Sequence, residues 1–189
     1  MKQHQAISTK KIVLTALLAA LTVVGSALRI TLPLEIGDTT SFHLGNIVCA
    51  LSGILLGPWL GGLAAGLGSA LYDILFYPAY IDECWITFLT KGAYALVAGW
   101  IAWRGKSCAY WKATLATAAG AVTYAALYLL KSYFYKGLLI QGLTHQAAMI
   151  AVVSKLPATI FNAVVAIVFA PILAVALQKA LERSHLSIQ

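Results

Sequence analysis

The chain has 189 residues, of which 61% are hydrophobic and 10% are charged, and its formal net charge is +7. Soluble globular domains are about 45–50% apolar and about 25% charged, so this composition excludes an ordinary soluble domain and indicates a membrane protein. Basic residues beside cytoplasmic span ends explain the positive charge without a nucleic-acid partner. At about 20 residues per span, the length predicts an all-α integral membrane fold of six transmembrane helices.

The apolar runs divide the chain in order into a single transmembrane domain over residues 1–189. The first run is expected to be a helix rather than a cleaved signal peptide, because further spans follow. Residues 31–42 are expected to form an outer loop, since their alternation is too weak to predict a strand. Only Gly57 and Pro58 separate the second and third runs, which are therefore predicted to be antiparallel neighbours. The predicted spans are residues 11–30, 43–56, 59–77, 84–103, 113–135 and 148–177.

The last predicted span is long and contains Pro157 and Pro171. Proline removes a backbone donor, so both residues are expected to kink or shorten this helix.

The distribution of charge predicts the orientation. Cytoplasmic loops of membrane proteins carry an excess of Lys and Arg. Placing both termini in the cytoplasm puts most basic residues there and directs most acidic residues outward. The basic residues are Lys2, Lys10, Lys11, Arg104, Lys106, Lys112, Lys179 and Arg183, and the acidic ones are Glu35, Asp38, Asp73, Asp82 and Glu83.

Polar side chains on one face of the span 113–135 suggest a cavity. Tyr124, Tyr128, Lys131 and Tyr135 are spaced i, i+4, i+7 and i+11, which is one helical face. An interfacial aromatic belt with a snorkelling lysine would explain Lys131 and Tyr135. Tyr124 lies about three turns deeper, so we favour a cavity-lining face.

The span 148–177 repeats this pattern with Lys155, Thr159 and Asn162. Asn162 lies within an apolar run. It is expected either to form a helix–helix hydrogen bond, typically worth about 0.6 kcal/mol, or to contact a ligand.

Lys91 lies about two turns below the predicted outer surface. It is expected either to pair with Asp73 or Glu83 or to face an enclosed, hydrated site, because a buried charge needs compensation. Trp85 is expected either to stack on a flat ring or to belong to an aromatic belt.

These pieces together resemble a known family. HLGNIVCALSGILLGPWLGGLAAGLGSALYDIL at residues 43–75 is followed by an acidic loop and by FLTKGAYALVAG at residues 88–99. This pattern resembles the substrate-binding S component of an energy-coupling factor (ECF) vitamin transporter, of the riboflavin-transporter-like branch. The resemblance covers most of the chain and is strongest over residues 43–99.

The resemblance implies a multi-pass protein of a prokaryotic plasma membrane, with the six-helix S-component fold and both termini in the cytoplasm. It implies a transmembrane coupling subunit and two cytoplasmic ATPases as partners. ATP and Mg would be used by those partners, and no cofactor or metal is expected on this chain, which would not be an enzyme. The family's small-residue motif in the first helix, which helps to dock the coupling subunit, corresponds to Ala16 and Ala20.

The resemblance also implies one vitamin or vitamin precursor bound from outside. A polar and aromatic site suits a small heteroaromatic ring with hydroxyls, so hydroxymethylpyrimidine or pyridoxine is favoured over riboflavin or pantothenate. A stand-alone carrier, or an intramembrane enzyme that uses Asp73 or Glu83 with His43, is the alternative class. The candidate binding residues are Asn46, Asp73, Trp85, Lys91, Tyr94, Tyr124, Tyr128, Lys131, Lys155 and Asn162.

Overall fold

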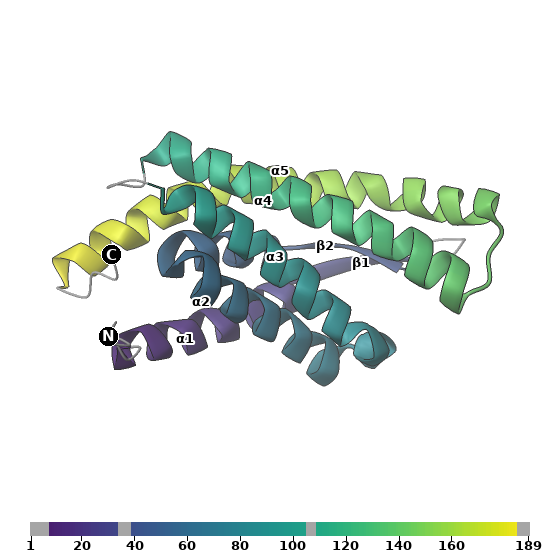
Figure 1. Ribbon diagram of the computed structural model, residues 1–189, viewed down its shortest axis with the longest axis horizontal. Helices are drawn as coiled ribbons and strands as arrows, with labels where there is room; N and C mark the ends of the chain where they lie inside the picture. The colour runs from purple at the N-terminus through teal and green to yellow at the C-terminus, as the bar shows by residue number, and fades with distance from the viewer. Residues whose placement is uncertain (1–7, 34–38, 105–108, 185–189) are drawn as a thin grey trace, which may run out of the picture.

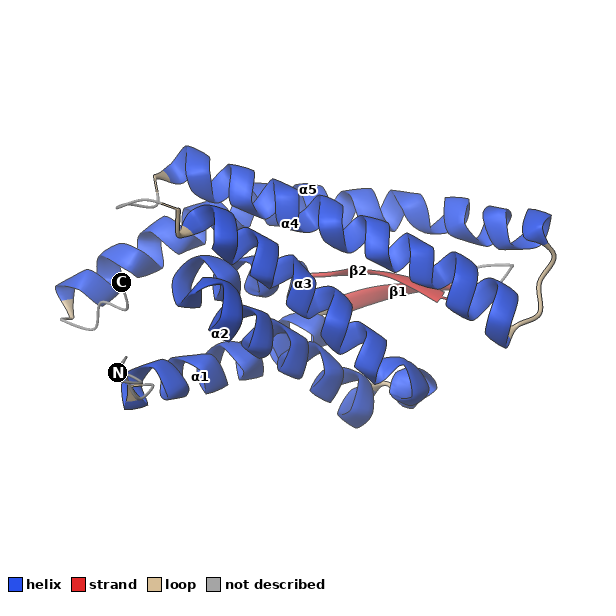
Figure 2. Cartoon of the chain, viewed as in Figure 1, coloured by secondary structure: helices blue, strands red, loops and turns tan. Residues whose placement is uncertain are grey.

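The structure, a computed structural model, describes residues 8–33, 39–104 and 109–184 (Figure 1). Helices account for almost all of it (Figure 2). Among the described residues, five helices are long and apolar enough to cross a membrane. The elements in chain order are α1 (Thr9–Ala27), β1 (Arg29–Pro33), β2 (Thr39–His43), α2 (Gly45–Phe76), η1 (Pro78–Glu83), α3 (Cys84–Ala102), α4 (Tyr110–Leu130), η2 (Lys131–Ile140) and α5 (His145–Arg183).

Helix α2 folds back on itself at Gly57. Cys49 Sγ lies 3.9 Å from Ser69 Oγ, whereas a straight helix would separate residues twenty positions apart by about 30 Å. Two separate spans were predicted over residues 43–56 and 59–77, and apart from their outer ends both lie within this one element. At 1.5 Å per residue, the arm before Gly57 is about 18 Å long, which is shorter than the roughly 30 Å hydrocarbon core. The described residues therefore contain five candidate spans, one of which is a folded pair of arms.

The sequence explains this reversal. Gly57 has φ 83° and ψ −179°, a backbone conformation that is essentially restricted to glycine. Pro58 has no N–H, so the carbonyl of Ile54 lacks its helical donor. The indole Nε1 of Trp103, directly after α3, donates to that carbonyl at 3.0 Å. A side chain outside α2 thus supplies the hydrogen bond that the backbone of the turn lacks.

Strands β1 and β2 form a two-stranded antiparallel ribbon between α1 and α2. Arg29 is opposite His43, and Thr31 is opposite Ser41. The prediction of a loop over residues 31–42 was therefore wrong for both ends of this segment. Strand formation depends on cross-strand and packing partners more than on local alternation. The sequence pattern of these short strands therefore did not indicate a strand. Residues 34–38 lie outside the described part of the chain.

Glycines bring α2 and α3 close together. A Cβ atom added to Gly62 would lie 3.2 Å from the carbonyl oxygen of Gly92, and one added to Gly66 would lie 2.8 Å from that of Phe88. Small residues at this spacing allow helix backbones to approach. The Gly62–Gly66 pair therefore serves helix packing.

Helix α5 runs unbroken through Pro157 and Pro171. Its 39 residues are about 58 Å long at 1.5 Å per residue, so it is longer than the predicted span 148–177, and the prolines do not shorten it.

The start of α1, the end of α3, the start of α4 and the end of α5 all lie at the end of the molecule drawn on the left in Figure 1. The basic residues Lys10, Lys11, Arg104, Lys112, Lys179 and Arg183 belong to these segments, while η1 with Asp82 and Glu83 lies at the opposite side. Lys2, Lys106, Glu35 and Asp38 lie outside the described residues.

Candidate functional site

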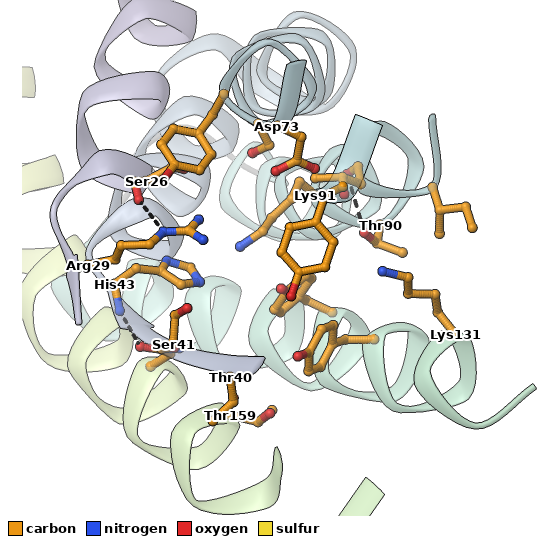
Figure 3. Close-up of a pocket in the computed structure, with 18 of the residues that line it drawn as sticks. Ser26, Arg29, Thr40, Ser41, His43, Asp73, Thr90, Lys91, Lys131 and Thr159 are labelled. Carbon is orange, nitrogen blue, oxygen red and sulfur yellow. Dashed lines mark hydrogen bonds between the residues drawn. The ribbon is translucent and has the colours of Figure 1, made fainter. Parts of the chain in front are cut away.

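A cavity of about 100 Å³ lies between the ribbon and helices α2 to α5. Its lining is mostly polar and aromatic (Figure 3). Seven of the predicted site residues line it, namely Asp73, Lys91, Tyr124, Tyr128, Lys131, Lys155 and Asn162. They come from α2, α3, α4, η2 and α5, so segments far apart in the sequence meet at one point.

Three of the predicted residues do not line the cavity. Asn46 is 2% exposed and lies behind Lys91, whose ammonium group donates to its side-chain oxygen. Tyr94 is fully buried and stacks on Tyr124. Trp85 is 55% exposed.

Tyrosines form one wall of the cavity. The rings of Tyr124 and Tyr128 are 5.7 Å apart between centroids, with an interplanar angle of 20°. Tyr94 extends the stack behind Tyr124 at 6.1 Å and 21°. Gly120 makes this possible, because a Cβ atom there would lie 2.4 Å from Tyr94 Cδ2. The helical face predicted from the sequence is therefore a continuous aromatic surface as far as Lys131.

Tyr135 leaves this face. The chain becomes π-helical from Lys131 to Ile140, and a π-helix repeats i→i+5 rather than i→i+4, so the face rotates. Tyr135 packs edge-on against Trp85, with ring centroids 6.1 Å apart.

Lysine side chains lie against the tyrosine wall. Lys91 Nζ is 4.0 Å from the centre of the Tyr124 ring, and Lys155 Nζ is 5.7 Å from that of Tyr128. Such cation–π contacts partly compensate an ammonium group removed from water. Lys155 also donates to Ser132 Oγ at 3.4 Å. Both lysines are buried.

The buried carboxylate of Glu83 is held by two other lysines. Lys131 donates to its Oε2 atom, and Lys136 Nζ lies 3.1 Å from its Oε1 atom. The hydrogen bond that the structure gives Lys91 goes to Asn46. Among the described residues, Lys91 forms a salt bridge with neither Asp73 nor Glu83, and its role at an enclosed binding site stays a prediction.

Asn162 joins α5 to the ribbon. Its side-chain oxygen accepts from the His43 backbone N–H at 2.9 Å, and its amide nitrogen donates to the Ser41 carbonyl at 2.8 Å. The sequence suggested a helix–helix bond or a ligand contact. The structure shows that both ends of the amide bind the backbone of β2 beside the cavity.

Comparison with known proteins agrees with this architecture. A family model described as the S component of ECF-type riboflavin transporters matches residues 6–179. The chain belongs to this family. An S component is a transporter subunit in a membrane and not an enzyme. The chain is also 31% identical over 118 residues to a Pyrococcus woesei protein described as an uncharacterized protein in the gap 3′ region, an alignment covering 62% of this chain and 74% of the relative.

Other residues of this S component line the cavity without having been predicted as binding residues, and Arg29 and His43 are two of them. Arg29 donates from Nε to the Ser26 carbonyl at 2.9 Å, and its guanidinium lies 4.4 Å from the centre of the Tyr72 ring. His43 was named as a functional residue only in the enzyme alternative. Register pairing places Arg29 opposite His43, so recognising the ribbon would have placed both residues beside the cavity.

The His43 ring contributes an unusual polar atom. Its Nδ1 is buried and has no hydrogen-bond partner among the described residues. Burial lowers the pKa of His43 well below its usual value, and the positive charges of Lys91 and Arg29 lower it further. The ring is therefore neutral at pH 7.

Proposed function

We propose that this S component captures a small vitamin or vitamin precursor with a single aromatic ring from outside the cell. It would pass this ligand inward with a transmembrane coupling subunit and two ATPases that use ATP and Mg, and would bind no cofactor itself. Family membership supports the function and the partners.

The proposed topology is that of a multi-pass protein in a prokaryotic plasma membrane. The two arms of α2 and the other four candidate helices would make up the six helices of the family fold. The helix ends that carry the basic residues lie on one side, which supports placing both termini in the cytoplasm.

The observation that carries the choice of ligand is the size and lining of the cavity. This cavity measures about 100 Å³, less than the cavity of about 150 Å³ that binds benzene, so even a one-ring ligand requires it to widen, and a one-ring ligand requires the least widening. The Tyr124–Tyr128 wall offers a stacking surface, and the hydroxyl groups of Thr40, Thr90 and Thr159 offer hydrogen bonds. Hydroxymethylpyrimidine and pyridoxine suit this site.

Riboflavin is the second candidate, because the matching family model carries its name. Its three fused rings require a larger cavity than the one present, so binding would require the ribbon or α4 to move outward. Pantothenate has no ring to stack on the tyrosines and ranks lower, although a lysine could bind its carboxylate.

Calorimetric titration of the purified chain in detergent tests the proposal. Hydroxymethylpyrimidine, pyridoxine, riboflavin and pantothenate are compared under the same conditions. We expect nanomolar binding of a one-ring compound, since a scavenging receptor has to capture a scarce ligand. Tight binding of riboflavin alone, or of no compound in the panel, would contradict the one-ring assignment.

Two tyrosine variants on the same stretch of helix make a matched pair. Tyr128→Leu removes a ring from the cavity wall, whereas Tyr135→Leu removes one that contacts Trp85 outside it. We expect only Tyr128→Leu to weaken binding. Loss of a base-stacking aromatic costs about 1–3 kcal/mol in single-stranded nucleic-acid sites, so a weakening of about tenfold or more is expected here.

A further inference from the structure

Positive charge exceeds negative charge around the cavity. Four cationic side chains line it, those of Arg29, Lys91, Lys131 and Lys155. Asp73 is the only carboxylate among the described lining residues. It is buried and lies within electrostatic reach of Arg29, Lys131 and Lys91. One carboxylate therefore faces several cations.

A second carboxylate nearby does not restore the balance. Glu83 is bound by Lys131 and by Lys136, which brings an additional positive charge with it. Among the described residues, neither Arg29 nor Lys91 forms a salt bridge with a carboxylate. Glu35 and Asp38 lie outside the described residues.

Two of the cations have neutral partners. The ammonium group of Lys91 is bound by the Asn46 amide oxygen and lies over the Tyr124 ring. The Arg29 guanidinium donates to the Ser26 backbone and stacks on Tyr72. A hydrogen bond from a cation to a carboxylate is roughly twice as strong as one between neutral groups. A ligand carboxylate would therefore be a better partner for these two cations than the neutral groups they contact now.

These groups converge on one part of the cavity. Figure 3 shows that the side chains of Arg29, His43 and Lys91 extend toward one another from β1, β2 and α3. His43 adds the buried Nδ1 atom that lacks a partner among the described residues. The two cationic groups thus meet beside the His43 ring, next to the tyrosine wall.

We infer that the ligand of this cavity is a small aromatic acid, whose ring packs against the tyrosine wall beside Lys91 and whose carboxylate lies between Arg29 and Lys91. The inference rests on the proposed function. It selects, among one-ring ligands, those that carry a negative charge. Asp73, on the α2 side of the cavity, would accept a hydrogen bond from a ring N–H or amino group. An acid is thus preferred over the alcohol built on the same ring.

Matched acid and alcohol pairs test the inference on the intact purified chain. One pair is pyridoxine and 4-pyridoxate, and the other is hydroxymethylpyrimidine and the corresponding pyrimidine-5-carboxylate. Calorimetry should show the acid binding at least about tenfold more tightly than the alcohol in one pair, since an added charge-assisted contact is worth about that much.

The possible outcomes separate this inference from the proposed function. An alcohol that binds as tightly as its acid, or more tightly, in every pair that binds would overturn the inference and leave the function in place. If no one-ring compound binds and none co-purifies by mass spectrometry, both proposals are wrong.

Variants then locate the charge preference. Lys91→Met and Arg29→Gln should each reduce the ratio of acid affinity to alcohol affinity about tenfold. Lys112→Met, at the opposite end of the molecule, should leave it unchanged. Arg29→Gln decides the result if Lys91→Met does not fold. An unchanged ratio in the folded variants would refute the placement of the carboxylate.

Discussion

Replacing Asn162 by alanine tests how the ribbon is held against the binding cavity. The side chain makes two hydrogen bonds, one to the His43 N–H and one to the Ser41 carbonyl. Strand β2 supplies Thr40, Ser41 and His43 to the cavity lining. The substitution removes both bonds and leaves two backbone groups of β2 without these partners, so the strand should lie against α5 less firmly.

The magnitude follows from the burial of these groups. A buried polar group left without a partner costs about 1–3 kcal/mol, and both bonds are only partly buried, so the lower limit applies to each. The sum is about 2 kcal/mol. If ligand binding requires β2 to pack against α5 as in the unchanged protein, the ligand has to supply this free energy of about 2 kcal/mol. Because about 1.4 kcal/mol corresponds to a tenfold change in affinity, the affinity should fall about 30-fold.

Two measurements on the same preparation check this prediction. Calorimetry gives the ligand affinity, and hydrogen exchange gives the protection of the His43 amide, which should decrease. Thr117→Val is a suitable control, because Thr117 is also buried and hydrogen-bonded but does not line the cavity. Unchanged affinity together with unchanged exchange at His43 in Asn162→Ala would refute the reasoning.

Three further predictions concern the turn, the histidine and the proposed docking face. Gly57→Ala should lower stability by about 1–3 kcal/mol, because φ is 83° there; Gly142→Ala, with no atom within 4 Å of the new Cβ, should cost less in the same thermal assay. Since burial lowers the pKa of His43, the folded state holds it neutral, so stability should decrease as pH falls below about 6.5, and His43→Gln should show a smaller decrease. Ala16→Leu and Ala20→Leu alter exposed positions of α1 and should abolish uptake by the reconstituted complex without changing ligand affinity; normal uptake would exclude a docking role.

The sequence alone determined the class of protein and much of one cavity wall. Hydrophobic runs are local features, so composition and run length sufficed to identify a helical membrane protein. The spacing of Tyr124, Tyr128 and Lys131 is local too, because helical periodicity assigns residues to one face before any tertiary contact is known. The spacing of Gly62 and Gly66 is local as well, but only the structure shows that this pair packs α2 against α3.

Only the tertiary structure decided which polar groups meet. Lys91 contacts Asn46, and Glu83 contacts Lys131. These choices depend on how α2, η1, α3 and η2 are packed, which no local pattern encodes. The ribbon is a second example, because its strands gain stability from each other and from Asn162, 119 residues after His43. The cavity therefore depends on long-range pairing, while the helices that surround it depend on local hydrophobicity.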